Sequence, residues 1–343
     1  MIKDNMVKLI LGNKGYEKHM TDEGDQLQKG LVNNGWIISG MGYDGMNNVP
    51  AIIERYKPDV VFIQDKRDWD KNFNGSFGDE SNHFYNVNVL SNYKNIVKVI
   101  PVKDAGSVVE YQEGFAKEVN ADILVTYYHQ KSVNRHSLWT NNYNHIVRTY
   151  HSVDKDYIMP LLDKNMIDSV RRDKGIVSGA INKQVYPQRT SIILDLKQLI
   201  GDKGNRIDTY MHPGYGMKGA MTPQYLDELT KYKVSICTCS KYQFALRKIM
   251  EAVSCGCICL TNLPQWDELP VIDKYLVRFS MGDNSKDIIK LAEEYIDKWY
   301  DKNYVDIARE CMEYYDYNNI GRILNENITE LVIKHKEKTN EKH

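Results

Sequence analysis

Short runs of aliphatic and β-branched residues alternate with segments of helical hydrophobic spacing along almost the whole chain. In the first half, the runs that predict strands are 7–11, 36–39, 59–63, 96–101, 123–127 and 145–150. In the second half, the predicted strands are 176–179, 206–211, 234–238, 257–261 and 275–279. Helical spacing fills the gaps, as in 22–34, 108–119 and 243–254. Strands that alternate with helices form parallel sheets covered by helices on both faces, so the pattern predicts an α/β protein.

A polar, charge-dense stretch at 163–175 interrupts this alternation and is typical of an interdomain linker. The chain has 343 residues, enough for two α/β domains that each bury a core. We therefore expect an N-terminal domain over 1–165 and a second domain over 174–315. Residues 316–343 are expected to form a C-terminal helix with a charged tail.

The net charge is close to zero, because 45 Lys and Arg residues face 46 Asp and Glu residues. No global field attracts a polyanion, so any phosphate-binding groups must be placed locally. No charged-then-apolar leader opens the chain, and its longest apolar stretches are too short for a membrane span. The sequence is that expected of a soluble, cytoplasmic protein.

Five cysteines are crowded into a short part of the second half: Cys237, Cys239, Cys255, Cys257 and Cys259. They lie in apolar runs where small side chains fill strand cores, and their one-residue gaps are not those of a structural zinc site. We expect packing rather than metal binding. Disulfides are not expected in a protein without signs of export.

Two charged residues follow the predicted strand 234–238 and lie three apart on the next helix, Lys248 and Glu251. Ligands bind at the carboxyl ends of strands in open α/β sheets. A carboxylate can accept hydrogen bonds from both hydroxyls of a ribose, and an ammonium can hold a diphosphate. An ordinary surface pair is the alternative reading of the same spacing.

The segment Lys-Ile-Met-Glu251-Ala-Val-Ser-Cys-Gly256 resembles the donor-binding helix of group-1 glycosyltransferases of the GT-B fold. The resemblance implies two Rossmann-like domains facing across a cleft, with C-terminal helices packing back toward the first domain. It also implies a UDP-sugar as co-substrate, a retaining reaction, and no metal or cofactor. In those families a second Glu often stands eight residues before the first; here that position is Gln243.

The start of the second domain carries a further resemblance, through Gly179 and the sequence Tyr186-Pro-Gln-Arg189. It is similar to the spore-maturation-protein-like branch and, more loosely, to bacteriophage DNA glucosyltransferases. This implies that Gly179 lets the backbone approach a phosphate and that Arg189 reaches the diphosphate. Tyr215, in the glycine-rich turn 212–216, is a candidate for the base pocket. A Pro-started helix with an exposed Arg, and a plain turn, are the alternatives.

Catalytic groups are sought in the loops that follow strands of the first half. Asp65 is the first candidate for a base and Asp154 the second, while His129 and His151 are candidates to contact the sugar. For each, a solvated loop residue is the alternative reading. An Asp-x-Asp pattern at Asp154 falls at a predicted helix start, where Asp is a common cap, so it predicts no metal site.

The function predicted is transfer of a hexose or pentose from a UDP-sugar to an acceptor hydroxyl of a glycan, a small molecule or modified DNA. A phage-type enzyme acting on a hydroxymethylated base is the first alternative, with phosphate and base contacts from residues 66, 67, 69, 171, 172, 174 and 183. A non-catalytic module that binds a sugar nucleotide or glycan is the second. A Rossmann oxidoreductase is disfavoured, because Gly12-Asn-Lys-Gly15 replaces the G-x-G-x-x-G fingerprint after the first strand.

Overall fold

The computed structural model describes residues 6–12, 23–40, 42–64, 84–102, 109–167, 172–198, 206–211 and 221–340. The chain divides into two compact units. Among the described residues, unit 1 extends to Tyr150 and resumes at Asn318, and unit 2 extends from His151 to Tyr317. The expected end of the first domain, at 165, falls within a helix that belongs to unit 2.

Unit 1 contains a six-stranded sheet in which every pairing is parallel, in the order β2-β1-β3-β4-β5-β6. Its strands are β1 (Lys8–Leu11), β2 (Ile37–Ser39), β3 (Val60–Ile63), β4 (Val97–Val102), β5 (Ile123–Thr126) and β6 (Ile146–Arg148). All six coincide with predicted strands. The residues of β3, β4 and β5 are buried throughout, because helices cover both faces of a parallel sheet.

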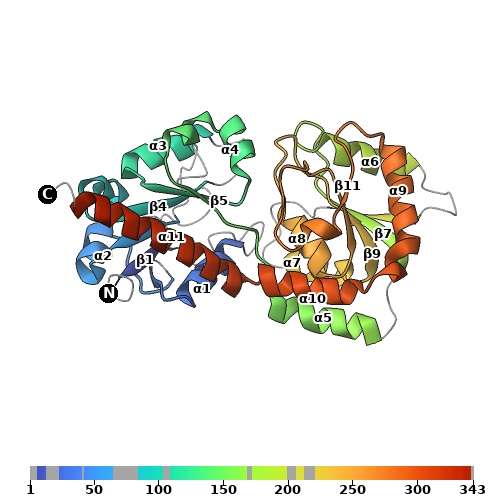
Figure 1. Cartoon of the computed structure of the whole chain (residues 1–343), viewed down its shortest axis with the longest axis horizontal. Helices are drawn as coiled ribbons and strands as arrows, with labels where there is room; N and C mark the ends of the chain where they lie inside the picture. Colours follow the sequence, from blue (N-terminus) through green and yellow to red (C-terminus); the bar gives the residue numbers. More distant parts are fainter. Residues whose placement is uncertain are drawn as a thin grey trace. The chain divides into compact units, whose positions relative to one another are not determined.

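Helices lie on both faces of this sheet (Figure 1). They are α1 (Glu23–Val32), α2 (Val49–Tyr56), η3 (Val87–Asn92), α3 (Val109–Val119), α4 (Gln130–His136), η4 (Leu138–Asn142) and α11 (Tyr317–Asn340). Helices α1 and α11 lie together on one face and α3 and α4 on the other. The last helix of the chain therefore returns to the first unit, as predicted.

Unit 2 contains a five-stranded parallel sheet in the order β11-β10-β9-β7-β8. Its strands are β7 (Arg172–Gly179), β8 (Ile207–Met211), β9 (Tyr232–Ile236), β10 (Ile258–Thr261) and β11 (Val277–Arg278). Its helices are α5 (Lys155–Ile167), α6 (Pro187–Gln198), α7 (Met221–Leu229), α8 (Arg247–Ser254), η5 (Asp273–Tyr275), α9 (Ser285–Asp297), η6 (Lys298–Asp301) and α10 (Tyr304–Tyr315). The predicted α/β class thus holds in both units.

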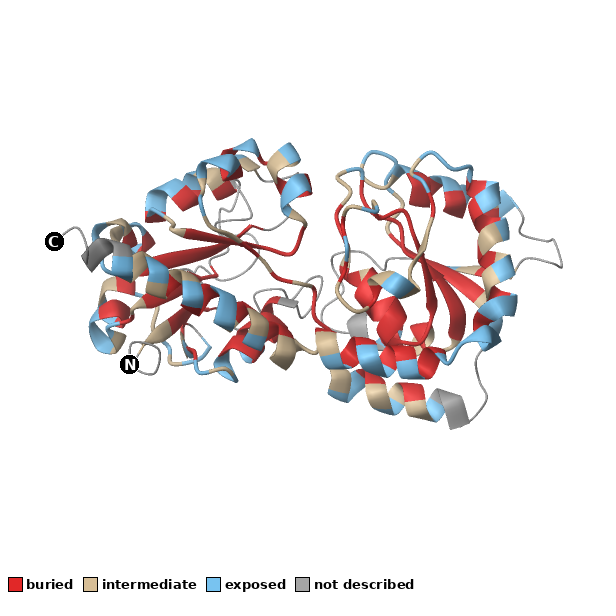
Figure 2. Ribbon diagram, viewed as in Figure 1, coloured by how far each residue is buried: buried red, intermediate tan, exposed pale blue. Residues whose placement is uncertain are grey.

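The core of each unit follows its sheet, and buried residues run along the strands and the inner sides of the helices (Figure 2). The six cysteines are all free and all buried. Cys257 directly precedes β10 and Cys259 lies within it. Cys311 packs beside Ser254 of α8, with 3.2 Å between its Sγ and the Oγ of Ser254. The predicted packing role of the cysteines is confirmed.

The predicted linker at 163–175 is wrong. Residue 163 belongs to α5, and Arg172, Asp173 and Lys174 already belong to β7. Charged residues can begin a strand here because each finds a partner of opposite charge: the Nζ of Lys174 lies 2.7 Å from Asp208, and the Nζ of Lys233 lies 2.8 Å from Asp173. The density of charge therefore marked the solvated end of a sheet.

The two segments that join the units are bonded to each other by their backbones. The N–H of Val153 donates to the carbonyl of Tyr315 at 2.9 Å, and the N–H of Tyr317 donates to the carbonyl of Val153 at 3.2 Å. In the part of the chain that the structure describes, no helix combines the length and the apolar character needed to cross a bilayer.

Candidate functional site

Gly179 ends β7, between β8 and β9, at the carboxyl edge of the second sheet. Its φ of +120° is a conformation that side chains disfavour. A Cβ at this position would lie 2.5 Å from the Nζ of Lys248 and 2.6 Å from the Nη1 of Arg189. Two cationic nitrogens therefore converge on the same point beside the backbone.

Arg189 is buried in the first turn of α6. Its Nε and Nη2 donate to the side-chain and backbone oxygens of Thr238 at 3.1 and 3.0 Å, and its guanidinium lies 4.0 Å from the ring centre of Tyr186. These contacts fix the orientation of the guanidinium group, and its Nη1 points toward Gly179. Burial lowers the pKa of Arg189, because the groups around the guanidinium do not fully replace the water that stabilises its positive charge.

Lys248 lies in the first turn of α8, and its Nζ donates to the Oγ of Ser178 at 3.2 Å. The same Oγ lies 2.9 Å from the hydroxyl of Tyr225. The side chain keeps some exposure while its ammonium is enclosed by protein. Burial first, and then the charge of Arg189, lower the pKa of Lys248 to about 7.

This arrangement is suited to binding an anion. Two like charges in a poorly solvated place repel each other and cost free energy, and an anion between them removes that cost. The glycine keeps the point between them free of a side chain, so a phosphate oxygen can approach both nitrogens and the backbone. A diphosphate matches the arrangement, because the guanidinium of Arg189 and the ammonium of Lys248 can each bind one of its two phosphates.

Glu251 is buried one turn after Arg247 on α8, and its Oε1 lies 3.2 Å from the Nε of that residue. Its charge also acts on Lys248 and on Tyr225. The predicted donor residues Gly179, Arg189, Lys248 and Glu251 are thus neighbours. Arg247, which sequence reasoning missed, is signalled only by its spacing of four from Glu251.

Gln243 does not lie on the helix, contrary to the predicted span 243–254. It adopts φ +59°, its N–H donates to the carbonyl of Ser240 at 2.9 Å, and α8 begins at Arg247. A left-handed residue cannot continue a right-handed helix, so a loop leads into α8. The Nε2 of Gln243 approaches the sulfur of Met281 at 3.5 Å.

A chain of buried amides supports this loop. The Nε2 of Gln188 donates to the carbonyls of Ser280 and Asp283 at 3.0 and 3.2 Å. Its Oε1 accepts from the Nδ2 of Asn262 at 2.7 Å, which leaves the Oδ1 of Asn262 to accept from the N–H of Cys239 at 2.6 Å. This series of hydrogen bonds connects α6 with the segments that follow β9, β10 and β11. It was not predicted from the sequence.

The predicted catalytic residues that the structure describes belong to both units. His129 caps α4 of unit 1, its Nδ1 accepting from the N–H of Lys131 at 3.1 Å. His151 is buried at the start of unit 2, and the Oδ1 of Asp154 accepts from the N–H of Tyr157 at 3.1 Å, at the start of α5. Asp65 and Tyr215 lie outside the described residues.

Ser178, Thr238 and Tyr225 also contact the cationic nitrogens and were missed. Their residue types occur throughout the sequence, and only the pairing of β7 with β8 and β9 brings them to Lys248 and Arg189. Position at the C-terminal end of a predicted strand, as for Ser178 in 176–179 and Thr238 in 234–238, is the one signal that could have found them.

No protein-family model matches the chain, and no curated protein matches its sequence. Solved structures do match its fold over nearly the full length. A glycosyltransferase from Rickettsia africae is 10% identical, with a TM-score of 0.53 over 96% of this chain and 99% of that one. Anabaena HepE, solved with UDP, is 10% identical, with a TM-score of 0.52 over 95% and 100%. An α-glucosyltransferase, solved with UDP-glucose and DNA containing an abasic site, is 11% identical, with a TM-score of 0.54 over 94% and 98%.

These likenesses establish the fold. The two parallel sheets with their flanking helices are the two Rossmann-like domains of the GT-B fold, as the sequence predicted. At such low identity, residue roles rest on the geometry of this chain.

Proposed function

We propose that the protein is a glycosyltransferase that moves a sugar from a UDP-sugar to an acceptor hydroxyl. The convergence of Arg189 and Lys248 on Gly179 carries the proposal. A group that leaves as a nucleoside diphosphate develops negative charge on its phosphate oxygens, and cations already positioned beside it stabilise that charge. The GT-B fold and neighbours solved with UDP or UDP-glucose support a UDP-sugar as donor.

In this proposal the Nη1 of Arg189 and the Nζ of Lys248 bind the diphosphate, and Glu251 binds the ribose hydroxyls from the same helix as Lys248. Arg247, whose Nε lies 3.2 Å from Oε1 of Glu251, orients that carboxylate until the ribose arrives. The two cations take the role that a divalent metal plays in other sugar transfers, so the reaction needs no metal. We further propose that it retains the anomeric configuration, with the leaving phosphate accepting the proton of the acceptor.

Calorimetric titration with UDP-glucose tests the donor site. Arg189→Ala and Glu251→Gln should each weaken binding by about 10- to 150-fold, since a hydrogen bond to a charged group contributes about 1.5–3 kcal/mol. Unchanged binding in both variants would overturn the assignment. Sugar transfer or donor hydrolysis that persists in EDTA supports a metal-independent reaction, and its complete loss contradicts it.

The acceptor is a second question, separate from the donor. The α-glucosyltransferase solved with UDP-glucose and DNA shares the fold, and we carry modified DNA over as an acceptor candidate beside glycans and small molecules. Mass analysis of products formed with each acceptor decides among them. Tight donor binding without hydrolysis or transfer to any acceptor would favour a non-catalytic module.

A further inference from the structure

Three neighbouring strands of the first sheet end side by side, in the order β2-β1-β3. The residues that follow them are Gly40, Gly12 and Gln64. Backbone hydrogen bonds continue past the strands: the N–H of Gly12 donates to the carbonyl of Ser39 at 3.0 Å, and that of Gln64 to the carbonyl of Leu11 at 2.9 Å. Ligands of open α/β sheets bind at this carboxyl edge, so the three residues mark a candidate site within unit 1.

Gln64 carries an amide that is buried without a partner. The side chain is fully buried, and within the described part of the chain neither its Nε2 nor its Oε1 forms a hydrogen bond. A buried amide without partners costs free energy. If the side chain turns toward a ligand at the strand end, its amide gains two hydrogen bonds and breaks none. The position of Gln64 therefore favours binding of a polar ligand.

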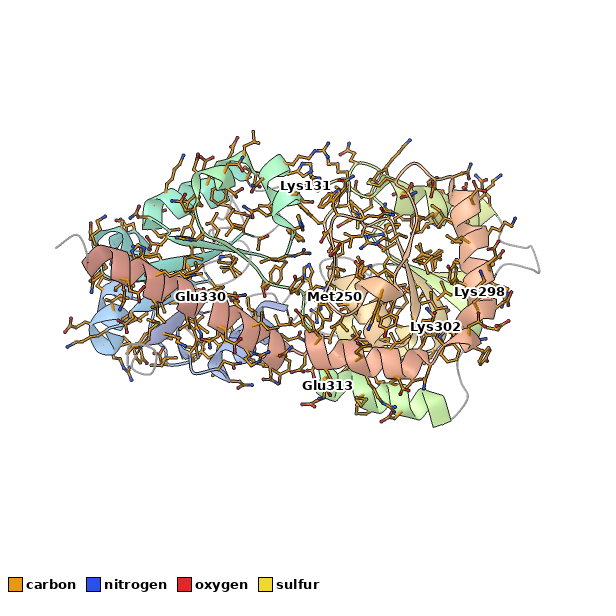
Figure 3. The ribbon with its side chains drawn as sticks, viewed as in Figure 1. Lys131, Met250, Lys298, Lys302, Glu313 and Glu330 are labelled. Atoms are coloured by element: carbon orange, nitrogen blue, oxygen red, sulfur yellow. The ribbon has the colours of Figure 1, made fainter. Side chains whose placement is uncertain are left out.

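A second amide lies beside the end of β1. A Cβ added to Gly12 would clash with the Oε1 of Gln28, so this amide reaches the backbone where the strand ends. Gln28 is buried on α1, and its Nε2 donates to the carbonyl of Gly24 at 3.2 Å. Helix α1 packs backbone to backbone against α11, the helix that carries Glu330 in Figure 3. The position of Gln28 is therefore fixed by the fold of unit 1.

Tyr43 joins an exposed aromatic ring to this amide. Its hydroxyl donates to the Oε1 of Gln28 at 3.3 Å, and the residue is 40% exposed. The carboxylate of Asp44 fixes the loop that carries the ring. It accepts from the N–H groups of Gly40 and Met46 at 2.9 and 3.1 Å. A ring held in this way can stack on a ligand at low entropy cost.

The electrostatic surroundings of Tyr43 favour a ligand without negative charge. Burial, and then the charge of Asp25, raise the pKa of Tyr43 to about 12, so its hydroxyl stays a neutral donor beside a carboxylate. Arg55 contacts this loop at the sulfur of Met46 and the ring of Tyr56. We give the name β1-edge site to five uncharged residues: Gly12, Gln28, Gly40, Tyr43 and Gln64.

The basic residues expected from the sequence to contact DNA belong to other parts of the chain. The Nη1 of Arg172 lies 3.4 Å from the Oε2 of Glu228, and the Nζ of Lys174 lies 2.7 Å from the Oδ1 of Asp208. Both charges are thus balanced within unit 2, whereas Lys183 is exposed. Lys66, Arg67, Trp69 and Arg171 lie outside the described residues.

We propose that the β1-edge site binds a carbohydrate and that the acceptor hydroxyl belongs to this sugar. The ring of Tyr43 stacks on the apolar face of a pyranose. The amide of Gln64 exchanges hydrogen bonds with two neighbouring hydroxyls, since both an amide and a diol donate and accept. A nucleic acid brings phosphates, which call for cations that these five residues do not supply. The role as acceptor site rests on the proposed sugar transfer, whereas sugar binding itself is measured without a donor.

The test uses the p-nitrophenyl glycosides of glucose, galactose, mannose and N-acetylglucosamine, with calorimetry for binding and mass analysis for transfer from UDP-glucose. At least one of them should bind and act as acceptor. Gln64→Met and Tyr43→Ala should each raise its KM at least roughly tenfold, because they remove the hydrogen bonds and the stacking surface. Methionine keeps the unbranched shape of glutamine without its amide, so the thermal midpoint of Gln64→Met should not fall.

Two control variants remove the same groups elsewhere. Thr149→Val is matched to Gln64→Met, because Thr149 is also buried in unit 1 and its Oγ1 has no hydrogen-bond partner among the residues that the structure describes. Tyr157→Ala on α5 is matched to Tyr43→Ala, since Tyr157 is 37% exposed. Neither residue belongs to the β1-edge site, and both controls should keep the KM of the wild type.

Titration with UDP-glucose separates this proposal from the proposed function. All variants and controls should bind UDP-glucose like the wild type, because the donor residues belong to unit 2 and are unchanged. A wild type that binds UDP-glucose but none of the four glycosides overturns the β1-edge site and leaves the donor site standing. An unchanged KM in both variants, or an equal rise in the controls, has the same consequence, as does transfer to a hydroxymethylated oligonucleotide alone. Glycoside binding, weakened in both variants, by a wild type that takes no UDP-glucose contradicts the proposed function alone.

Discussion

Gly179 is the position at which backbone geometry and charge meet. Its φ of +120° is accessible to glycine, and the absent Cβ leaves the space that both cations approach. Gly179→Ala should weaken UDP-glucose binding by at least roughly tenfold and cost about 1–3 kcal/mol of stability through backbone strain. Gly35→Ala is the matched control, because Gly35 also has a positive φ, +87°, but nothing lies within 4 Å of its added Cβ. Calorimetry should show normal donor affinity in the control and a loss only at Gly179.

Lys248 gives the donor site a pH dependence. Its pKa of about 7 in the free protein rises when a diphosphate stabilises the ammonium, so binding takes up a proton. The contribution is complete below pH 7 and falls as pH rises above it, by up to about tenfold per pH unit until the pKa of the complex is reached. UDP-glucose is the probe, since both phosphates of its diphosphate stay ionised and its charge does not change over this pH range. Lys248→Arg stays charged and should show a flatter profile; parallel profiles would contradict the prediction.

At the scale of elements, the second sheet places its binding groups through the ends of its strands. Strand β7 supplies Gly179, α6 supplies Arg189 and α8 supplies Lys248, and the amide chain through Gln188 and Asn262 ties the connecting segments together. Asn262 contacts the backbone of Cys239, next to the Thr238 that holds Arg189. We infer that Asn262 positions Arg189 without touching the donor.

Asn262→Ala removes both bonds of this amide and leaves a buried N–H without its acceptor. We expect a stability loss of about 1–3 kcal/mol together with several-fold weaker UDP-glucose binding. Asn262→Asp keeps the acceptor for Cys239 but not the donor to Gln188, so it should fall between the alanine variant and the wild type. Asn284→Ala, which removes the cap that accepts from Lys286 at 2.8 Å, should cost about 1 kcal/mol without changing affinity. Equal affinity losses in both alanine variants would mean that stability alone controls binding.

At the scale of the whole molecule, α11 returns the end of the chain to unit 1. A Cβ on Gly321 would lie 2.3 Å from the carbonyl carbon of Gly30, so α11 and α1 approach backbone to backbone. Nearby, the Oδ1 of Asn325 on α11 accepts from the Nζ of Lys8 at 2.8 Å and from the Nε1 of Trp36 at 2.9 Å. The fold of unit 1 therefore includes a helix encoded more than 150 residues after its last strand.

Gly321→Ala should force α11 away from α1 and destabilise unit 1 by about 1–3 kcal/mol. Urea unfolding followed by tryptophan fluorescence measures this, because Trp36 contacts α11. Gly114→Ala in α3 has open space for its Cβ and should be neutral or gain about 0.5–1 kcal/mol from helix propensity. Donor affinity should stay unchanged in both, because the donor residues belong to unit 2. A similar loss in the two variants would exclude the close approach as the cause.

The α/β class and all eleven described strands could be read from the sequence, because a buried parallel strand is written as one local apolar run. Gly179, Arg189 and Lys248 were singled out through the resemblance to group-1 glycosyltransferases, which is carried by short local motifs. Helix starts were harder to predict. Gln243 lies in a segment whose hydrophobic spacing predicts a helix. Its backbone is left-handed, however, and α8 begins only at Arg247.

The sequence by itself therefore determined which residues form strands and which polar residues lie near their ends, since both depend on local spacing. Tertiary structure alone decided that Arg189 and Lys248 share one point beside Gly179 and that Arg247 pairs with Glu251. Strand order brings together residues that are dozens of positions apart, and no local pattern records that order. Arg189 and Lys248 meet beside Gly179 because β7 lies between β8 and β9.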